Sequence, residues 1–194
     1  DINQDLYLSH ITQNYFNNKI DNAGYNRSSK LPLSLKMKIA KSLNNQYFLD
    51  GSFNIMDDTF IVISNLYNTK NGSLVAENRF VESNIFTLVD KLVNQLKIDL
   101  SIPLQYLETT KDLPVNSITT DNIKALASYI QGELIWSDNN RDSAFTLLTN
   151  AIKHDKYFLH AHARLSELKM SALRDESWSD HWEIILKGID KLSD

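Results

Sequence analysis

Two histidines separated by a single residue, His160 and His162, are the residues whose types and spacing most readily suggest chemistry. A His-x-His step in a strand can hold one metal ion, but the segment around this one has a helical pattern. Residues two apart on a helix point to different sides, so the pair is poorly placed to share an ion. His154 and His181 do not improve the metal-ligand spacing. We therefore expect one histidine in a surface groove, the other packed, and no metal site.

The stretch YFLDGSF, residues 47–53, places an Asp-Gly-Ser step inside an apolar segment. A phosphate-binding loop requires several glycines followed by the N-terminus of a helix. Gly51 is alone, and a second strand-like segment follows it. A glycine inside a strand marks either a bulge or a close approach of another backbone, and we expect the bulge.

Two further patterns have structural explanations. Asp57 and Asp58 could form a pair of catalytic acids, but they fall where a tight turn is predicted, and Asp favours turns. The segment SELK at 166–169 has a Ser-x-x-Lys spacing, but no Lys-Thr-Gly or Ser-Asp-Asn partner accompanies it. Because no Ser-His-Asp set or carboxylate cluster stands out either, the sequence predicts a non-enzymatic chain without a cofactor.

Composition and charge narrow the class of protein further. Hydrophobic residues make up 42% and charged residues 23% of the 194 residues, as in ordinary soluble globular proteins. The formal net charge of -4 provides no basic surface, so we expect no direct nucleic-acid contact by this fragment. The absence of cysteine excludes disulfides, thiol catalysis and zinc-thiolate sites. The chain begins within a helical pattern, and we expect it to be an excised piece of a longer protein.

Apolar periodicity predicts an α+β domain that begins with two helices. The first covers residues 2–20, where Leu8, Ile11 and Tyr15 have helical spacing. The second is the amphipathic segment LSLKMKIAKSLNN, which follows Pro32.

Three strands and a third helix complete the predicted domain, which covers residues 1–105. YFLDGSFNIM, TFIVISNLY and SLVAENRFV alternate in polarity and are joined by two hairpins, so they predict a three-strand antiparallel meander. The third helix is capped by Ser83 or Asn84 and stopped by Pro103. The result is a small helix-covered sheet.

Residues 106–118 are polar, contain Pro114 and are predicted to form a linker. Beyond them the pattern is helical throughout, so the second domain, with its linker, covers residues 106–194. Its Gly132, Ala144 and Ala151 are spaced like the small positions of a tetratricopeptide repeat. The segment SYIQGELIWSDNNRDSAFTLLTNAIKHDKYFLHAHARLSEL thus resembles such a repeat, which implies an all-α tetratricopeptide-like domain.

The first domain resembles a second family, the TolB N-terminal-like domain of bacterial multidomain proteins. The segments that carry this resemblance are AKSLNNQYFLDGSF, FIVISNLYNTKNGSLVAENRF and NIFTLVDKLVNQLKIDL. ITTDNIKALASYIQGE resembles the usual junction from this domain into helical repeats. The two resemblances together cover roughly residues 30–165. The family normally begins with an apolar strand before its first helix, and this chain departs from that pattern.

In repeats of this kind the first helices line a concave surface. The residues of this chain that map near that surface are candidates for a binding groove: Tyr129, Glu133, Trp136, His160 and Glu167. A peptide could lie there with Trp136 as its anchor. The alternative is that Trp136 packs against the α+β domain and closes the seam between the two domains.

The paired resemblance implies a non-catalytic sensory or regulatory region of a bacterial transcription regulator of the CadC/ToxR type. Its partner would be a protein or a small-molecule signal, with a homodimer and an upstream transmembrane anchor as further expectations. Such an anchor would place this region on the periplasmic side, whereas soluble relatives keep it in the cytoplasm. The alternative from another class is the C-terminal regulatory or scaffold region of a bacterial serine/threonine kinase.

Overall fold

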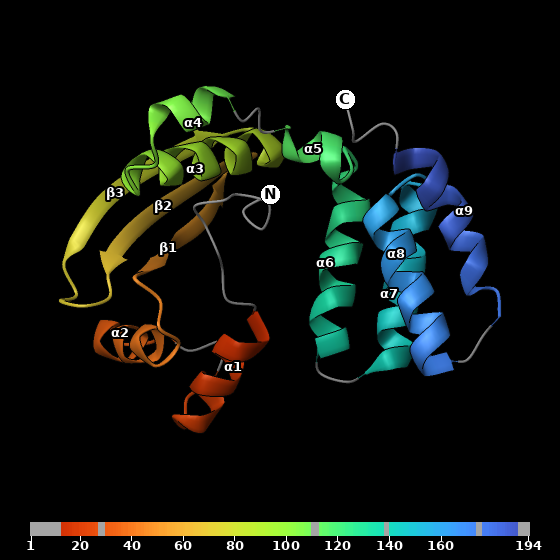
Figure 1. Cartoon of the computed structure of the whole chain (residues 1–194), viewed down its shortest axis with the longest axis horizontal. Helices are drawn as coiled ribbons and strands as arrows, with labels where there is room; N and C mark the ends of the chain where they lie inside the picture. Colours follow the sequence, from red (N-terminus) through yellow and green to blue (C-terminus); the bar gives the residue numbers. More distant parts are fainter. Residues whose placement is uncertain (1–12, 27–29, 110–112, 138–139, 174–175, 190–194) are drawn as a thin grey trace. The chain divides into compact units, whose positions relative to one another are not determined.

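The computed structural model describes residues 13–26, 30–109, 113–137, 140–173 and 176–189. It divides the chain into two compact units, residues 1–112 and 113–194, which we describe separately. The first unit contains a three-stranded sheet with helices and the second is entirely helical (Figure 1), which confirms the predicted α+β class with a helical C-terminal region. No helix among the described residues combines the length and apolarity needed to cross a membrane.

The sheet of the first unit is the predicted meander. Its strands β1 (Tyr47–Met56), β2 (Thr59–Asn68) and β3 (Leu74–Glu82) are antiparallel and lie in the order β1-β2-β3. Asp57 and Asp58 form the turn between β1 and β2 with φ values of 48° and 59°. Positive φ at both central residues is what a two-residue hairpin of type I′ requires, so these aspartates serve the turn.

Gly51 does not form the predicted bulge. It pairs in regular register with Ser64 of β2, and the register shift in the sheet lies elsewhere, between Leu66 and Tyr67. A Cβ atom on Gly51 would overlap the carbonyl oxygen of Ile63. Glycine is therefore needed for a close backbone approach, the second of the two explanations for a glycine within a strand.

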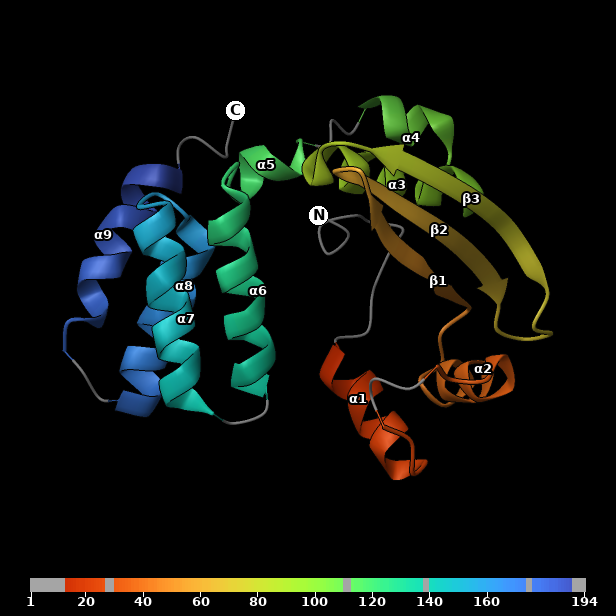
Figure 2. The same ribbon diagram turned by 180° about the vertical axis from the view of Figure 1, so that it is seen from behind.

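Helices accompany the sheet in the described part of the first unit. Helix α3 (Ile85–Asp99) packs along β2 and β3 (Figure 2), and the amide of Asn78 on β3 donates a hydrogen bond to Asp99 at 2.6 Å. Asn84 caps α3, as predicted, by accepting hydrogen bonds from the next turn. The helix ends at Asp99, before Pro103, and so is shorter than predicted.

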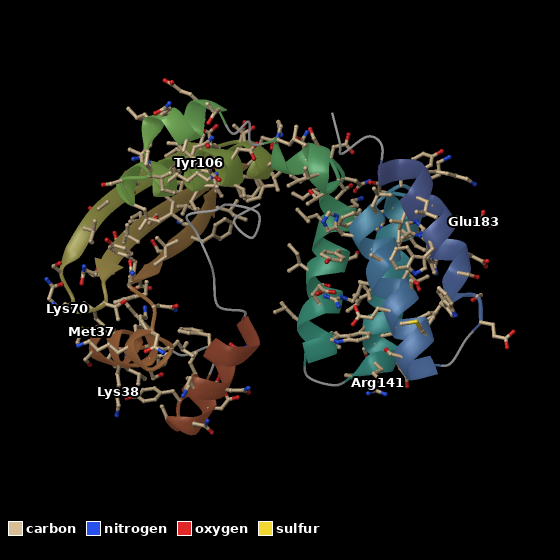
Figure 3. The ribbon with its side chains drawn as sticks, in the orientation of Figure 1. Met37, Lys38, Lys70, Tyr106, Arg141 and Glu183 are labelled. Atoms are coloured by element: carbon tan, nitrogen blue, oxygen red, sulfur yellow. The ribbon has the colours of Figure 1, made fainter. Side chains whose placement is uncertain are left out.

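Helices α1 (Gln13–Asn22) and α2 (Leu33–Ser42) form a small core of their own. Its buried residues and the half-buried residues packed against them are Ile20, Leu31, Ile39, Phe16, Leu35 and Leu43. Leu8 and Ile11, part of the predicted first helix, lie outside the described residues. Figure 3 shows Met37 of α2 beside the β2–β3 hairpin that carries Lys70, where a Cβ on Gly72 would lie 2.9 Å from the Met37 sulfur.

The predicted linker is more structured than its polarity indicated. Helix α4 (Leu104–Thr109) follows Pro103, and helix α5 (Val115–Ile118) begins directly after Pro114. Proline is favoured at the start of a helix because its fixed φ suits the first turn and its missing N–H has no partner to lose. Both prolines therefore start short helices where the sequence predicted only a break.

The second unit is a stack of helices joined by short connections. Helices α6 (Ile123–Ser137), α7 (Arg141–His154), α8 (Leu159–Leu168) and α9 (Trp178–Ile189) each pack against the next. A π-helical turn at Lys169–Leu173 extends α8.

Small residues allow these helices to approach closely. A Cβ on Gly132 of α6 would lie 3.0 Å from Leu148 of α7, and one on Gly188 of α9 would lie 2.6 Å from Leu159 of α8. Ala144 is fully buried in the same stack. Between α6, α7 and α8 the core is formed by Ala125, Ala151, Phe158 and Ala161.

Candidate functional site

The five predicted groove residues lie on the two helices expected to carry them. Tyr129, Glu133 and Trp136 belong to α6, and His160 and Glu167 belong to α8. The spacings of four and three residues on α6, and of seven on α8, are those of one helix face.

A sixth residue, Arg164 of α8, joins these side chains. Its Nε and Nη2 donate to the two carboxylate oxygens of Glu133 at 2.5 and 2.7 Å, and its Nη1 donates to Glu167 at 2.5 Å. The guanidinium also lies over the ring of Trp136, 5.7 Å from its centroid. Arg164 thus cross-links α6 to α8 with the bidentate geometry that arginine alone among the side chains can provide.

The electrostatics of this cluster are dominated by its two carboxylates. The hydrogen bonds from Arg164 to Glu133 raise the pKa of the guanidinium well above its ordinary value. One positive charge faces two negative charges, which leaves the cluster with a net negative charge. Glu167 is 51% exposed, against 29% for Glu133, so Glu167 carries the carboxylate more accessible to a partner.

Aromatic rings form the other end of the same face. Tyr129 packs on the buried Phe158 with ring centroids 5.0 Å apart and meets the exposed His160 at 6.4 Å. Burial first, and then the charge of Glu133, raise the pKa of Tyr129. The phenol therefore keeps its proton at neutral pH and can donate a hydrogen bond. The face offers an aromatic surface, a phenol and an accessible carboxylate within two helices.

Sequence reasoning missed Arg164, although a signal was present. Arg164 follows His160 by four residues and precedes Glu167 by three, so all three share one face of α8. Its pairing with Glu133, 31 residues away, is a tertiary contact that no local pattern reports.

Of the two histidines of α8, His160 is exposed and His162 is buried, as expected. The buried His162 has an unexpected partner. His162 is 3% exposed, and its Nδ1 lies 2.8 Å from Nδ1 of His181 on α9, which is 8% exposed. His162 Nε2 lies 3.0 Å from the carbonyl oxygen of Lys156. The sequence analysis considered His181 only as a metal ligand and did not predict this contact. The contact depends on how α9 folds back on α8, which residue spacing does not reveal.

The partners determine where the protons of the neutral pair lie. A carbonyl oxygen only accepts, so His162 must donate through Nε2 and, when neutral, accept at Nδ1. His181 must then donate from its own Nδ1. If His162 were protonated at Nδ1 as well, two N–H groups would face each other across 2.8 Å unless His181 moved its own proton from Nδ1 to Nε2. Protonation of His162 thus requires either the loss of this contact or a change of tautomer at His181.

This arrangement predicts that acid destabilises the helical unit. Burial lowers the pKa of His162 below 6.5, against smaller opposing effects of the Lys156 carbonyl and the Asp155 charge. The unfolded chain therefore binds more protons than the folded one below about pH 6.5, so stability falls as pH falls towards the folded pKa. We expect the unfolding constant to rise between pH 7.5 and 5.5, by up to about tenfold for this one group, measured by urea unfolding with tryptophan fluorescence.

Two variants separate this effect from other titrations. In His181→Asn, the amide can donate to neutral His162 or accept from its protonated form, so the loss of stability in acid should shrink. His154→Asn, at an exposed position at the end of α7, should keep the wild-type pH dependence. Equal pH dependence in the wild type and His181→Asn would contradict the role of the pair.

Comparison with known proteins does not identify a family for this chain. No family model matches the chain, and no curated protein matches it. The C-terminal domain of LpoB from Salmonella enterica is similar to 38% of this chain, over 56% of its own length, with a TM-score of 0.34 and 15% identity. The likeness spans little more than half of that domain and is too low to support a fold family or a function. The resemblances to TolB N-terminal-like domains and tetratricopeptide repeats therefore stay predictions.

Proposed function

We propose that this chain is a non-catalytic regulatory region that binds a protein segment on the α6–α8 face, defined by Tyr129, Glu133, Trp136, His160, Arg164 and Glu167. The observation that carries the proposal is the gathering of these side chains from two helices around one arginine. Arg164 holds Glu133 and Trp136 in place before any partner arrives. A surface organised in advance loses less conformational entropy on binding.

The chemistry of the face indicates the kind of segment it would take. Its net negative charge and accessible Glu167 favour a lysine or arginine on the partner. The rings of Trp136 and Tyr129 favour an apolar or aromatic residue beside that cation, because aromatic anchors provide much of the energy of protein interfaces. An amphipathic basic segment combines both features.

The non-catalytic part of the proposal is supported by how the side chains of the α6–α8 face are held. The two carboxylates of the α6–α8 face are held by hydrogen bonds from the Arg164 guanidinium. Binding is the chemistry for which this face is suited.

At a finer level, we propose that the region belongs to a transcription regulator of the CadC/ToxR type. The support is the order of its elements, in which a small α+β unit with a three-strand meander precedes a stack of helices. In this proposal, binding at the α6–α8 face shifts the packing or assembly of the regulator, while a separate domain contacts DNA.

Photo-crosslinking in cells of the source organism tests the binding role. A photoreactive phenylalanine analogue at His160 should give one adduct, identified by mass spectrometry as a protein cross-linked through a basic segment. The same analogue at Lys153, exposed on α7, should give none. Glu167→Lys should abolish the adduct, because it places a like charge against the partner's cation.

Glu183→Lys is the matched control for that charge reversal. Glu183 is an exposed carboxylate on α9 (Figure 3), outside the α6–α8 face, so its reversal should leave the adduct intact. Equal adducts at His160 and Lys153, or an adduct that survives Glu167→Lys unchanged, would contradict the proposal.

A further inference from the structure

Strand β1 has one side unpaired among the described residues, since it forms ladder contacts with β2 only. The carbonyl of Gln46 accepts from the N–H of Thr69, just beyond β2, at 2.9 Å. Antiparallel ladders alternate in steps of two residues, so the even-numbered residues of β1 direct their backbone groups at β2. The backbone groups of Tyr47, Leu49, Gly51, Phe53 and Ile55 consequently point away from β2, towards the open edge.

One observed hydrogen bond agrees with this assignment. The N–H of Ile55 donates to the side-chain oxygen of its neighbour Asn54, at 2.9 Å, and not to β2. The open edge of β1 therefore presents a row of backbone donors and acceptors, in which the N–H of Ile55 already has the Asn54 side chain as a partner that a pairing strand would replace.

The side chains along this edge are apolar and exposed. Leu49, Phe53 and Ile55 are 46%, 57% and 56% exposed on one face of the strand. The strand has one charged residue, Asp50, and that carboxylate is bound by Lys36 of α2 at 2.5 Å. Edge strands are normally protected from pairing by free charges, prolines or bulges, and β1 has none of these.

We propose that β1 is a dimerisation edge that pairs antiparallel with β1 of a second copy of this chain. A two-fold axis through Ser52 places Leu49 opposite Ile55 of the second copy, and Gly51 opposite its Phe53. Apolar side chains then meet on one face, and an aromatic ring covers a glycine, a favourable pairing in sheets. Asp50 faces Asn54 of the second copy, so no like charges oppose each other.

The same register matches the backbone groups. Leu49 pairs with Ile55 of the second copy and Gly51 with its Phe53. In all four residues the N–H and C=O groups point outward, so the two strands can exchange backbone hydrogen bonds. The two copies would thus form one continuous sheet. The edge serves as an isologous interface, because the same surface contributes from both sides. It lies in the α+β unit and does not depend on the α6–α8 face.

The chain has no cysteine, so a single introduced thiol can test whether the two-fold axis passes through Ser52. Ser52 would face Ser52 of the second copy as a non-hydrogen-bonded pair, with Cα atoms about 4.5 Å apart, within the range of a disulfide. We expect Ser52→Cys to form a disulfide-linked dimer on mild oxidation. Ser83→Cys, an exposed position just after β3, should form one at least about tenfold more slowly.

Introducing a charge at the apolar edge provides the second test. Dimerisation is measured by sedimentation equilibrium over a concentration series. Phe53→Lys should weaken dimerisation at least about tenfold, with the circular dichroism spectrum unchanged. Val75→Lys is the matched control, since Val75 is 44% exposed on β3 at the opposite edge, and it should dimerise like the wild type. A wild-type chain that stays monomeric, or a dimer that neither Phe53→Lys nor Ser52→Cys affects, would overturn the proposal.

Discussion

Replacing Gly51 with alanine is expected to destabilise the α+β unit by about 3 kcal/mol, at the upper end of typical overpacking costs. The added methyl group would overlap the carbonyl oxygen of Ile63, a backbone atom that cannot rotate away. Relief requires β1 and β2 to separate at the middle of their ladder, where Gly51 pairs with Ser64. Urea unfolding monitored by circular dichroism measures the loss.

Ser52→Ala is the control for this substitution. Ser52 is the next residue of the same strand and is exposed, so its replacement should change the free energy of unfolding by less than about 0.5 kcal/mol. If Gly51→Ala were as stable as Ser52→Ala, the close backbone approach described for β1 and β2 would be wrong.

Phe158→Ala is expected to destabilise the helical unit by about 4 kcal/mol. Phe158 is fully buried, and the buried residues of its cluster, Ala125, Ala151 and Ala161, are too short to fill the space its ring would leave. The cost of such a substitution rises with the volume of the cavity that remains after the half-buried neighbours relax. Because Tyr129 packs on the Phe158 ring, the substitution should also loosen the α6–α8 face.

The adjacent residue supplies the matched control. Tyr157 is 63% exposed and contacts the Lys156 ammonium through its ring, so Tyr157→Ala should cost less than about 1 kcal/mol. Thermal unfolding of the two variants measures the contrast. A Phe158→Ala variant as stable as Tyr157→Ala would show that this core is not where the helical unit derives its stability.

Local sequence patterns were sufficient to predict most of the helices and strands. The strands of the meander could be predicted because each alternates in polarity, and the Asp57–Asp58 turn because its residues tolerate positive φ. Helix α3 could be predicted from its cap at Asn84 and its apolar stripe. The prolines were harder, since Pro103 and Pro114 each begin a short helix where the sequence predicted only a break.

The residues of the candidate site also fall into two groups, those that spacing predicts and those that it does not. Residues on one helix face, such as Tyr129, Glu133 and Trp136, follow from spacing alone. The pairing of Arg164 with Glu133 and that of His162 with His181 join residues on different helices. Such contacts depend on how helices pack together, so composition and spacing could not predict them. Gly51 belongs to the same group, because only the position of β2 distinguishes a bulge from a close approach.

The most direct test of the proposal that this is the regulatory region of a transcription regulator is to identify which other domains the native protein contains. The native protein, isolated with an antibody against this chain, would be mapped by mass spectrometry of its peptides. We predict peptides of an upstream winged helix with a basic recognition helix. Peptides with the His-Arg-Asp and Asp-Phe-Gly motifs of a kinase, or a protein with no upstream domain, would contradict the claim.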